Sequence, residues 1–164
     1  MKQVRISGTG MYVPQRVVTN KDLEQLMDTT DAWIRERTGI SERRYAAPEE
    51  GPSELALKAT KKALAAAKLK PTDIDMIVVA TLSPDYFFPG TAAFLQHMLG
   101  LETTPSMDIR TQCSGFLYGL QVAQAFVASG QYKRVLLVGS ALHSRGIDLT
   151  TRGREVSVLF GDGA

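Results

Sequence analysis

The sequence predicts an α/β protein built around a mostly parallel sheet. Two continuous apolar runs, Met76–Ala80 and Val135–Val138, are typical of strands that are buried on both faces. Stretches with helical periodicity, 53–69 and 113–129, precede the two runs and place apolar side chains along one face. Buried strands that alternate with amphipathic helices favour a sheet with helices packed against it.

Composition narrows the class of protein. The chain has 164 residues with 19 Lys and Arg against 17 Asp and Glu, and its net charge of +2 is too small to indicate nucleic-acid binding. No segment approaches the roughly 18 apolar residues of a membrane span, and the N-terminus lacks the apolar run of a signal peptide. A single cysteine, Cys113, excludes an internal disulfide and a cysteine-based metal cluster. We therefore expect one cytoplasmic domain.

The first third of the chain predicts short elements. Residues 3–7 alternate apolar and polar side chains, which predicts a strand. Asn20 and Thr30 are candidate N-caps of two short helices, the second of which ends at Gly39. The composition of residues 44–52 is that of a loop.

The middle of the chain predicts a helix, a strand and a second helix. The alanine-rich segment 53–69 has helical periodicity, and a strand follows within 74–82. Residues 84–89 form a loop that carries three aromatic side chains. The next helix is capped by Thr91 and ends before Gly100.

The last third repeats the alternation of strand and helix. We predict a strand over 106–109, a helix over 113–129, a strand over 135–138, a polar loop over 140–153 and a strand over 156–160. No closing helix follows that strand before the chain stops. The sequence therefore predicts that residues 1–164 are half of a larger unit.

Cys113 is the first candidate for chemistry. A lone cysteine is most often a small buried apolar residue. Here, however, it follows one predicted strand and begins a predicted helix, whose N-terminal end favours a thiolate. Ligands of open α/β sheets bind at the carboxyl ends of the strands, where this residue falls. On residues alone, a buried cysteine and a nucleophile both stay open.

Two nucleotide motifs are excluded. Gly8-Thr9-Gly10 follows a predicted strand, but the third glycine of a dinucleotide-binding turn is replaced by Val13, and Pro14 prevents the helix from starting. A phosphate-binding loop of the Walker type is absent.

A second group of residues suits a nucleotide in another way. Trp33 is the only tryptophan, and a lone tryptophan most often packs in the core. Arginines such as Arg37 and Arg152 most often lie on the solvated surface. An aromatic face with arginines can nonetheless stack a base and bind phosphates. His143 is a weak candidate for a base that pairs with Cys113, because nothing local supports it.

Several segments together resemble the β-ketoacyl-acyl-carrier-protein synthase III family, whose members have the thiolase fold of two similar halves. Their order and spacing extend over nearly the whole chain, so chance similarity is a poor explanation. The matching segments are Gly8–Pro14, Asp31–Ile40, Ile77–Thr81, Asp108–Ile109, Cys113–Leu120, Asp148–Gly153 and Phe160–Ala164.

The resemblance implies an acyltransferase. Cys113 is then the nucleophile that takes an acyl group from acyl-coenzyme A (acyl-CoA), the substrate, with no permanently bound cofactor and no metal. Trp33 and Arg152 sandwich the adenine in this family. The other positions that match coenzyme contacts are Thr29, Arg37 and Gly153.

The resemblance also implies partners. Phe88 matches the position at which a second copy closes the acyl pocket, so a homodimer is expected. The second substrate of the family is malonyl-acyl-carrier protein, and a His and an Asn in the C-terminal half promote its decarboxylation. Neither His97 nor His143 matches that motif, so this chain resembles the N-terminal half alone.

The substrate stays open. Arg110-Thr111-Gln112 stand where small residues are common in the family, and bulkier neighbours change the acyl pocket. A specialised relative that makes polyketide, quinolone or long-chain β-keto products is one alternative. The other is a half-domain that only binds acyl-CoA or a partner.

Overall fold

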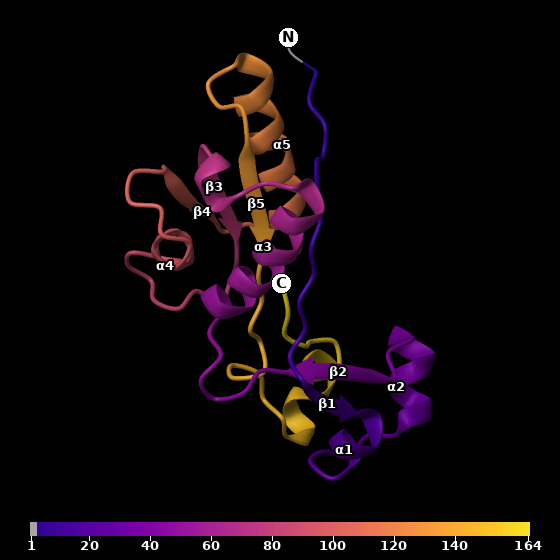
Figure 1. Ribbon diagram of the computed structural model, residues 1–164. Coiled ribbons are helices and arrows are strands. Elements are labelled where there is room, and N and C mark those ends of the chain that lie inside the picture. The colour runs from indigo at the N-terminus through magenta and orange to yellow at the C-terminus, as the bar shows by residue number, and fades with distance from the viewer. Residues whose placement is uncertain (1–2) are drawn as a thin grey trace.

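The central element is a three-stranded parallel sheet, seen in the computed structural model of Figure 1, which describes residues 3–164. Its order is β4 (Ser106–Ile109), β3 (Met76–Ala80) and β5 (Val135–Gly139), and Ile77 lies between Ser106 and Leu136. Every residue of β3 is buried, as expected for a central strand covered on both faces. The predicted parallel sheet is confirmed.

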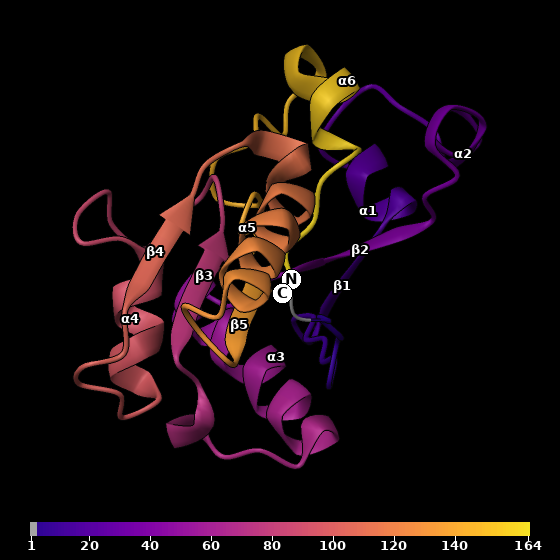
Figure 2. The ribbon, with the colours of Figure 1, turned by 90° about the horizontal axis from the view of Figure 1, so that it is seen from above.

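Helices cover both faces of this sheet (Figure 2). α3 (Pro52–Ala67) and α4 (Thr91–Met98) pack against each other and on one face, whereas α5 (Gly115–Ser129) covers the other. Two short 3-10 helices, η1 (Pro71–Asp73) and η2 (Gln112–Ser114), precede β3 and α5. None of the helices within residues 3–164 is long and apolar enough to cross a membrane.

The ends of the helices agree with the sequence to within one or two residues. α3 begins at Pro52, whose missing N–H suits a first turn, and Glu54 accepts a hydrogen bond from the Gly51 N–H at 2.8 Å. Gly130 follows α5 in the left-handed conformation that ends helices. The predicted start at Ser53 is therefore one residue late.

A smaller unit lies below the parallel sheet in Figure 1. It contains the antiparallel pair β1 (Arg16–Thr19) and β2 (Glu42–Tyr45), with α1 (Asn20–Glu24) and α2 (Asp31–Thr38) between them. The late segments η3 (Thr151–Gly153) and α6 (Arg154–Ser157) join it. Its core holds the buried side chains of Val18, Leu23, Met27, Ile34, Tyr45 and Val158.

Two predicted strands are wrong. Residues 3–7 have no regular structure, and they pair with no strand that the structure describes. Residues 156–160 are also not a strand, because α6 ends at Ser157 and Val158 is drawn into the smaller core. Alternation of apolar residues predicts an extended chain, but a strand also needs a neighbour to accept its hydrogen bonds.

The smaller unit also holds a pair of strands that the sequence did not predict. The segment 44–52 was expected to be a loop throughout, yet Arg44 and Tyr45 belong to β2. Tyr45 lies opposite Arg16 of β1. Each strand has only four residues, which is too short for periodicity to distinguish from a loop.

Candidate active site

Cys113 is exposed at the carboxyl end of the parallel sheet. It lies in η2, between the end of β4 and the first residue of α5, Gly115. A Cβ on Gly115 would lie 3.2 Å from the Cβ of Ala80, so the beginning of α5 sits close against the end of β3. Within residues 3–164 the thiol therefore has the exposure that a nucleophile requires, whereas a core cysteine would be buried.

The backbone before the thiol is strained. Gln112 has a φ of +47°, in the left-handed region that residues other than Gly, Asn and Asp rarely adopt. The neighbouring Thr111 has a buried hydroxyl with no hydrogen-bond partner among residues 3–164. Such conformations cost about 1–3 kcal/mol and are concentrated at functional sites. This sharp turn connects the end of β4 to α5 with Cys113 exposed on it.

An exposed aromatic loop lies beside the segment that leads to Cys113. Phe87 and Phe88 are both exposed, Phe88 to 90%. The guanidinium carbon of Arg110 lies 5.2 Å from the ring centre of Phe87. The loop thus contacts the chain three residues before the nucleophile, and Phe88 has an apolar surface free for another molecule.

Trp33 forms a second surface, on α2. Its backbone N–H donates to the hydroxyl of the N-cap Thr30 at 3.1 Å, which fixes the first turn of the helix. The side chain is half-buried and packs against the smaller core. The guanidinium carbons of Arg37 and Arg154 lie 4.5 and 4.6 Å from its ring centre. The indole therefore packs partly on the smaller core and partly against two guanidinium groups.

Arg152 points elsewhere. Its Nε donates to Asp148 at 2.8 Å, and the side chain is 89% exposed. Hydrogen bonds from Thr150 and Arg152 lower the pKa of Asp148 to about 2. A Cβ on Gly153 would overlap the Asp148 carbonyl, so this position needs glycine. The structure thus brings Arg154, rather than Arg152, onto the indole.

Sequence reasoning missed Arg154, although it lies in the same run of residues, 150–154. Its position follows from contacts across the chain. The Arg154 Nη1 donates to the Asp28 carbonyl at 2.7 Å, and the Asp28 N–H donates to the Thr151 hydroxyl at 2.9 Å. Next to them, Thr29 is 9% exposed, and its hydroxyl has no partner in the described chain. The structure therefore gathers residues 28–37 and 151–154 into one surface.

The weaker candidates have other roles. The ring of His143 packs on Phe160 at 4.7 Å between centres, and its backbone N–H donates to Asp162 at 2.8 Å. Open grooves of about 620 and 540 Å³ lie beside α3 and beside β1, and neither is lined by Cys113 or Trp33. Within residues 3–164, no three His, Cys, Asp or Glu side chains are grouped so as to hold a metal ion.

Comparison with known proteins agrees with this geometry. Residues 107–164 match the family described as 3-oxoacyl-[acyl-carrier-protein] synthase III. A β-ketoacyl-[acyl-carrier-protein] synthase III of Caldanaerobacter subterraneus is 50% identical over 159 residues, which are 97% of this chain and 47% of the relative. The chain is similar to β-ketoacyl-[acyl-carrier-protein] synthase III proteins over about half of their length. The resemblance seen in the sequence is thereby confirmed.

Two solved structures have the same fold. The 3-oxoacyl-[acyl-carrier-protein] synthase III of Aquifex aeolicus has a TM-score of 0.92 and 46% identity, over 96% of this chain and 50% of that one. The priming β-ketosynthase of the R1128 polyketide pathway has a TM-score of 0.92 and 36% identity, over 97% and 47% of the two chains. The predicted thiolase-like fold is confirmed, and the chain spans about half the length of the relatives it matches.

Proposed function

We propose that this chain is the nucleophile-bearing, N-terminal half of a β-ketoacyl-[acyl-carrier-protein] synthase III. The enzyme condenses an acyl-CoA primer with malonyl-acyl-carrier protein and so initiates fatty-acid biosynthesis. The observation that carries the proposal is the exposed thiol of Cys113 on the strained turn between β4 and α5. Relatives of this name, 46–50% identical to the chain, support it.

The reaction has two steps. In the first, the Cys113 thiolate attacks the carbonyl carbon of acyl-CoA, the bond from that carbon to the CoA sulfur breaks, and the CoA thiolate takes up a proton. Backbone N–H groups at the start of α5 are suited to stabilise the oxyanion. Because one thioester replaces another, this step is nearly neutral in energy, and no cofactor or metal is required.

In the second step, malonyl-acyl-carrier protein loses carbon dioxide, and the resulting carbanion attacks the acyl-Cys113 carbonyl. The C–S bond to Cys113 breaks, which restores the thiolate and leaves a β-keto thioester on the carrier protein. We propose that the His and Asn that promote decarboxylation lie in a C-terminal half, since the relatives are about twice as long as this chain.

The proposal assigns CoA to the Trp33 surface. Thr29, Trp33, Arg37, Arg152 and Gly153 would contact the coenzyme, and the indole would stack on its adenine. Arg152 would have to leave Asp148 to join it. The buried, unpartnered Thr29 hydroxyl supports a polar ligand beside residues 28–37.

The proposal also includes a homodimer and a cytoplasmic location. The exposed Phe88 would close the acyl pocket of a second copy. An exposed thiol that must stay free to act as a nucleophile suits a reducing compartment, of which the cytoplasm is one.

The test is intact-mass spectrometry of the purified protein that contains this chain, after incubation with a panel of acyl-CoAs. We expect one acyl adduct, whose added mass names the primer. Cys113→Ala should form none, whereas the control Ser114→Ala, changed at the next exposed position, should still be acylated. An adduct that survives in Cys113→Ala would refute the nucleophile assignment.

The same spectra separate the alternatives. A long-chain or unusual acyl adduct would favour a specialised relative over the initiating enzyme of fatty-acid synthesis. Binding of CoA without any adduct, in the presence of a complementing C-terminal half, would favour a half-domain that only binds. Neither alternative has a specific observation in its favour.

A further inference from the structure

A buried arginine without a carboxylate partner lies beneath the Trp33 surface. Arg43 of β2 is only 6% exposed, and no carboxylate in the described part of the chain lies within 4.0 Å of its guanidinium. Burial lowers the pKa of Arg43. Burial of a cation costs free energy unless hydrogen-bond acceptors of the protein replace its water. The acceptors of Arg43 therefore show which segments hold it in place.

All of those acceptors are neutral, and they come from separate segments. The Arg43 Nη2 donates to the Asn20 Oδ1 at 2.9 Å and to the Val158 carbonyl at 3.2 Å. The Nη1 donates to the Val18 carbonyl at 3.3 Å. One guanidinium therefore joins β1, the first residue of α1 and the residue that directly follows α6.

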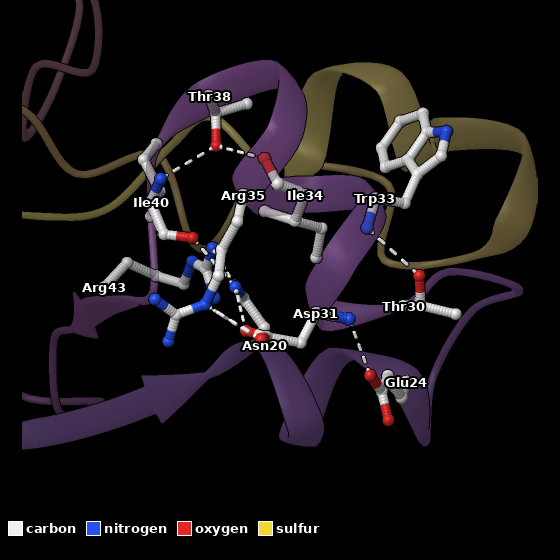
Figure 3. Close-up of polar contacts among 10 residues, drawn as sticks. All are labelled: Asn20, Glu24, Thr30, Asp31, Trp33, Ile34, Arg35, Thr38, Ile40 and Arg43. Carbon is white, nitrogen blue, oxygen red and sulfur yellow. Dashed lines mark hydrogen bonds and ion pairs between the residues drawn. The ribbon is translucent and has the colours of Figure 1, made fainter.

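Asn20 carries the connection to α2, as Figure 3 shows. This side chain is 1% exposed. Its Nδ2 donates at 2.8 Å both to the Asp31 Oδ1 and to the Ile40 carbonyl. Asp31 is the first residue of α2, and Ile40 lies just beyond its last turn. A single amide group thus holds both ends of the helix that bears Trp33.

These contacts form a continuous bridge between the two elements of the surface. It begins at Val158, the residue after α6, and passes through Arg43 and Asn20. It ends at Asp31, the first residue of α2, and at Ile40, two residues after the helix. Trp33 belongs to α2 and Arg154 to α6. The distance and tilt between the indole and the cation opposite it therefore depend on this bridge.

We propose that Arg43 and Asn20 are positioning residues that hold the indole of Trp33 in the place where the adenosine end of CoA stacks on it. The proposal rests on the assignment of CoA to the Trp33 surface. Neither side chain reaches the ligand, since both are buried. They act by fixing α2 against α6, which sets where the indole of Trp33 lies and how it is tilted.

The test uses Trp33 itself as the reporter, because it is the only tryptophan in the sequence. CoA is titrated into the protein that contains this chain while tryptophan fluorescence is followed, with any further tryptophan outside this chain replaced by phenylalanine. Arg43→Met keeps the length of the side chain and removes its donors, and should weaken CoA binding about tenfold or more. The matched control is Arg44→Met on the same strand, which should change it less than about twofold.

A second substrate separates positioning from general damage. Acyl-N-acetylcysteamine is a thioester without the adenosine, and its transfer to Cys113 should be the same in wild type and in Arg43→Met. Where Arg43→Met does not fold, Asn20→Ser is used instead, because it shortens the group that holds α2 and leaves the Arg43 cation in place. Urea unfolding establishes that each variant is folded before binding is measured.

The outcomes are distinct. A folded Arg43→Met or Asn20→Ser variant with unchanged CoA affinity would overturn the positioning role, as would an equal loss with acyl-N-acetylcysteamine. The wild type could instead form the acyl-Cys113 adduct while CoA leaves the fluorescence of Trp33 unchanged. That result would overturn the assignment of CoA to this surface, and with it the positioning role. Absence of the adduct itself would instead refute the proposed function.

Discussion

Single residues decide how the thiol is presented. Cys113 is exposed because the chain turns sharply at Gln112, whose φ of +47° belongs to the left-handed region. The place of Cys113 between a predicted strand and a predicted helix makes it a candidate nucleophile, but nothing in a glutamine predicts a positive φ at the residue before it. At the second surface, likewise, Trp33 was a candidate from its residue type, whereas Arg154 was not distinguishable from Arg152.

The strain at Gln112 leads to the first stability prediction. Gln112→Val should lower the free energy of unfolding by about 1–2 kcal/mol, because a β-branched side chain tolerates the left-handed region least. Gln112→Gly should not lower it, since glycine adopts that conformation freely. Urea denaturation followed by Trp33 fluorescence measures both, and Gln124→Val on the exposed side of α5 is the control, with a loss below about 0.5 kcal/mol. Equal losses in the two valine variants would contradict the strain.

At the scale of elements, α4 depends on a residue from a neighbouring strand. Its N-cap, Gly90, has no side chain to accept the free N–H groups of the first turn. Asp108 of β4 accepts the Ala92 N–H at 2.8 Å and so takes over that role. Burial raises the pKa of Asp108, although the N–H groups of Thr91 and Ala92 oppose that rise.

Removal of this cap should destabilise the fold. Asp108→Ala should cost about 1–2 kcal/mol, because the N–H groups at the start of α4 lose their acceptor, whereas Asp108→Asn retains an acceptor and should cost less. A raised pKa in the folded state means that the folded protein binds the proton more tightly. The free energy of unfolding of the wild type should therefore increase as the pH falls through the raised pKa toward 3.8, the ordinary value of an Asp carboxyl. Asp108→Asn has no carboxyl to protonate and should lack this increase. Urea unfolding at pH 4 and pH 7 measures the difference; identical pH profiles would contradict it.

At the scale of the whole molecule, the N-terminal segment between residue 3 and β1 passes alongside α3 (Figure 1). Gly8 and Gly10 let the two backbones approach, because a Cβ on either would come within 2.5 Å of a carbonyl oxygen of α3. Further on, the backbones of Tyr12 and Ala164 are joined by two hydrogen bonds of 2.8 and 2.9 Å. Apolar side chains of α5, such as Leu117, remain exposed, which agrees with a proposed second half.

The close approach gives a prediction for the assembly of the molecule. Gly10→Ala should lower the free energy of unfolding by about 1–3 kcal/mol, because its Cβ would lie 2.3 Å from the Ala59 carbonyl and backbone cannot move aside as a side chain can. The control is Gly146→Ala, where the nearest atom is 3.9 Å away. Thermal unfolding of both variants measures the effect, and equal stability would show that the segment does not lie against α3.

The sequence by itself determined the parallel strands, the two long helices α3 and α5, and the position of Cys113 between a strand and a helix. These depend on short-range physics: the period of apolar residues, glycines that end helices, and the direction of a strand that leads into a helix. Family resemblance along the chain added the candidates for contact with the coenzyme. Trp33 and Arg37 lie together on α2, and Arg152 and Gly153 lie together in η3.

Only the tertiary structure decided the rest. Residues 3–7 and 156–160 have the pattern of strands but are not strands, because a strand forms only where a neighbour supplies hydrogen bonds. Arg154 lies on Trp33 because contacts with a segment more than a hundred residues away hold it there. The bridge through Arg43 has the same origin: its acceptors are brought together by folding, and no local pattern in the sequence records them.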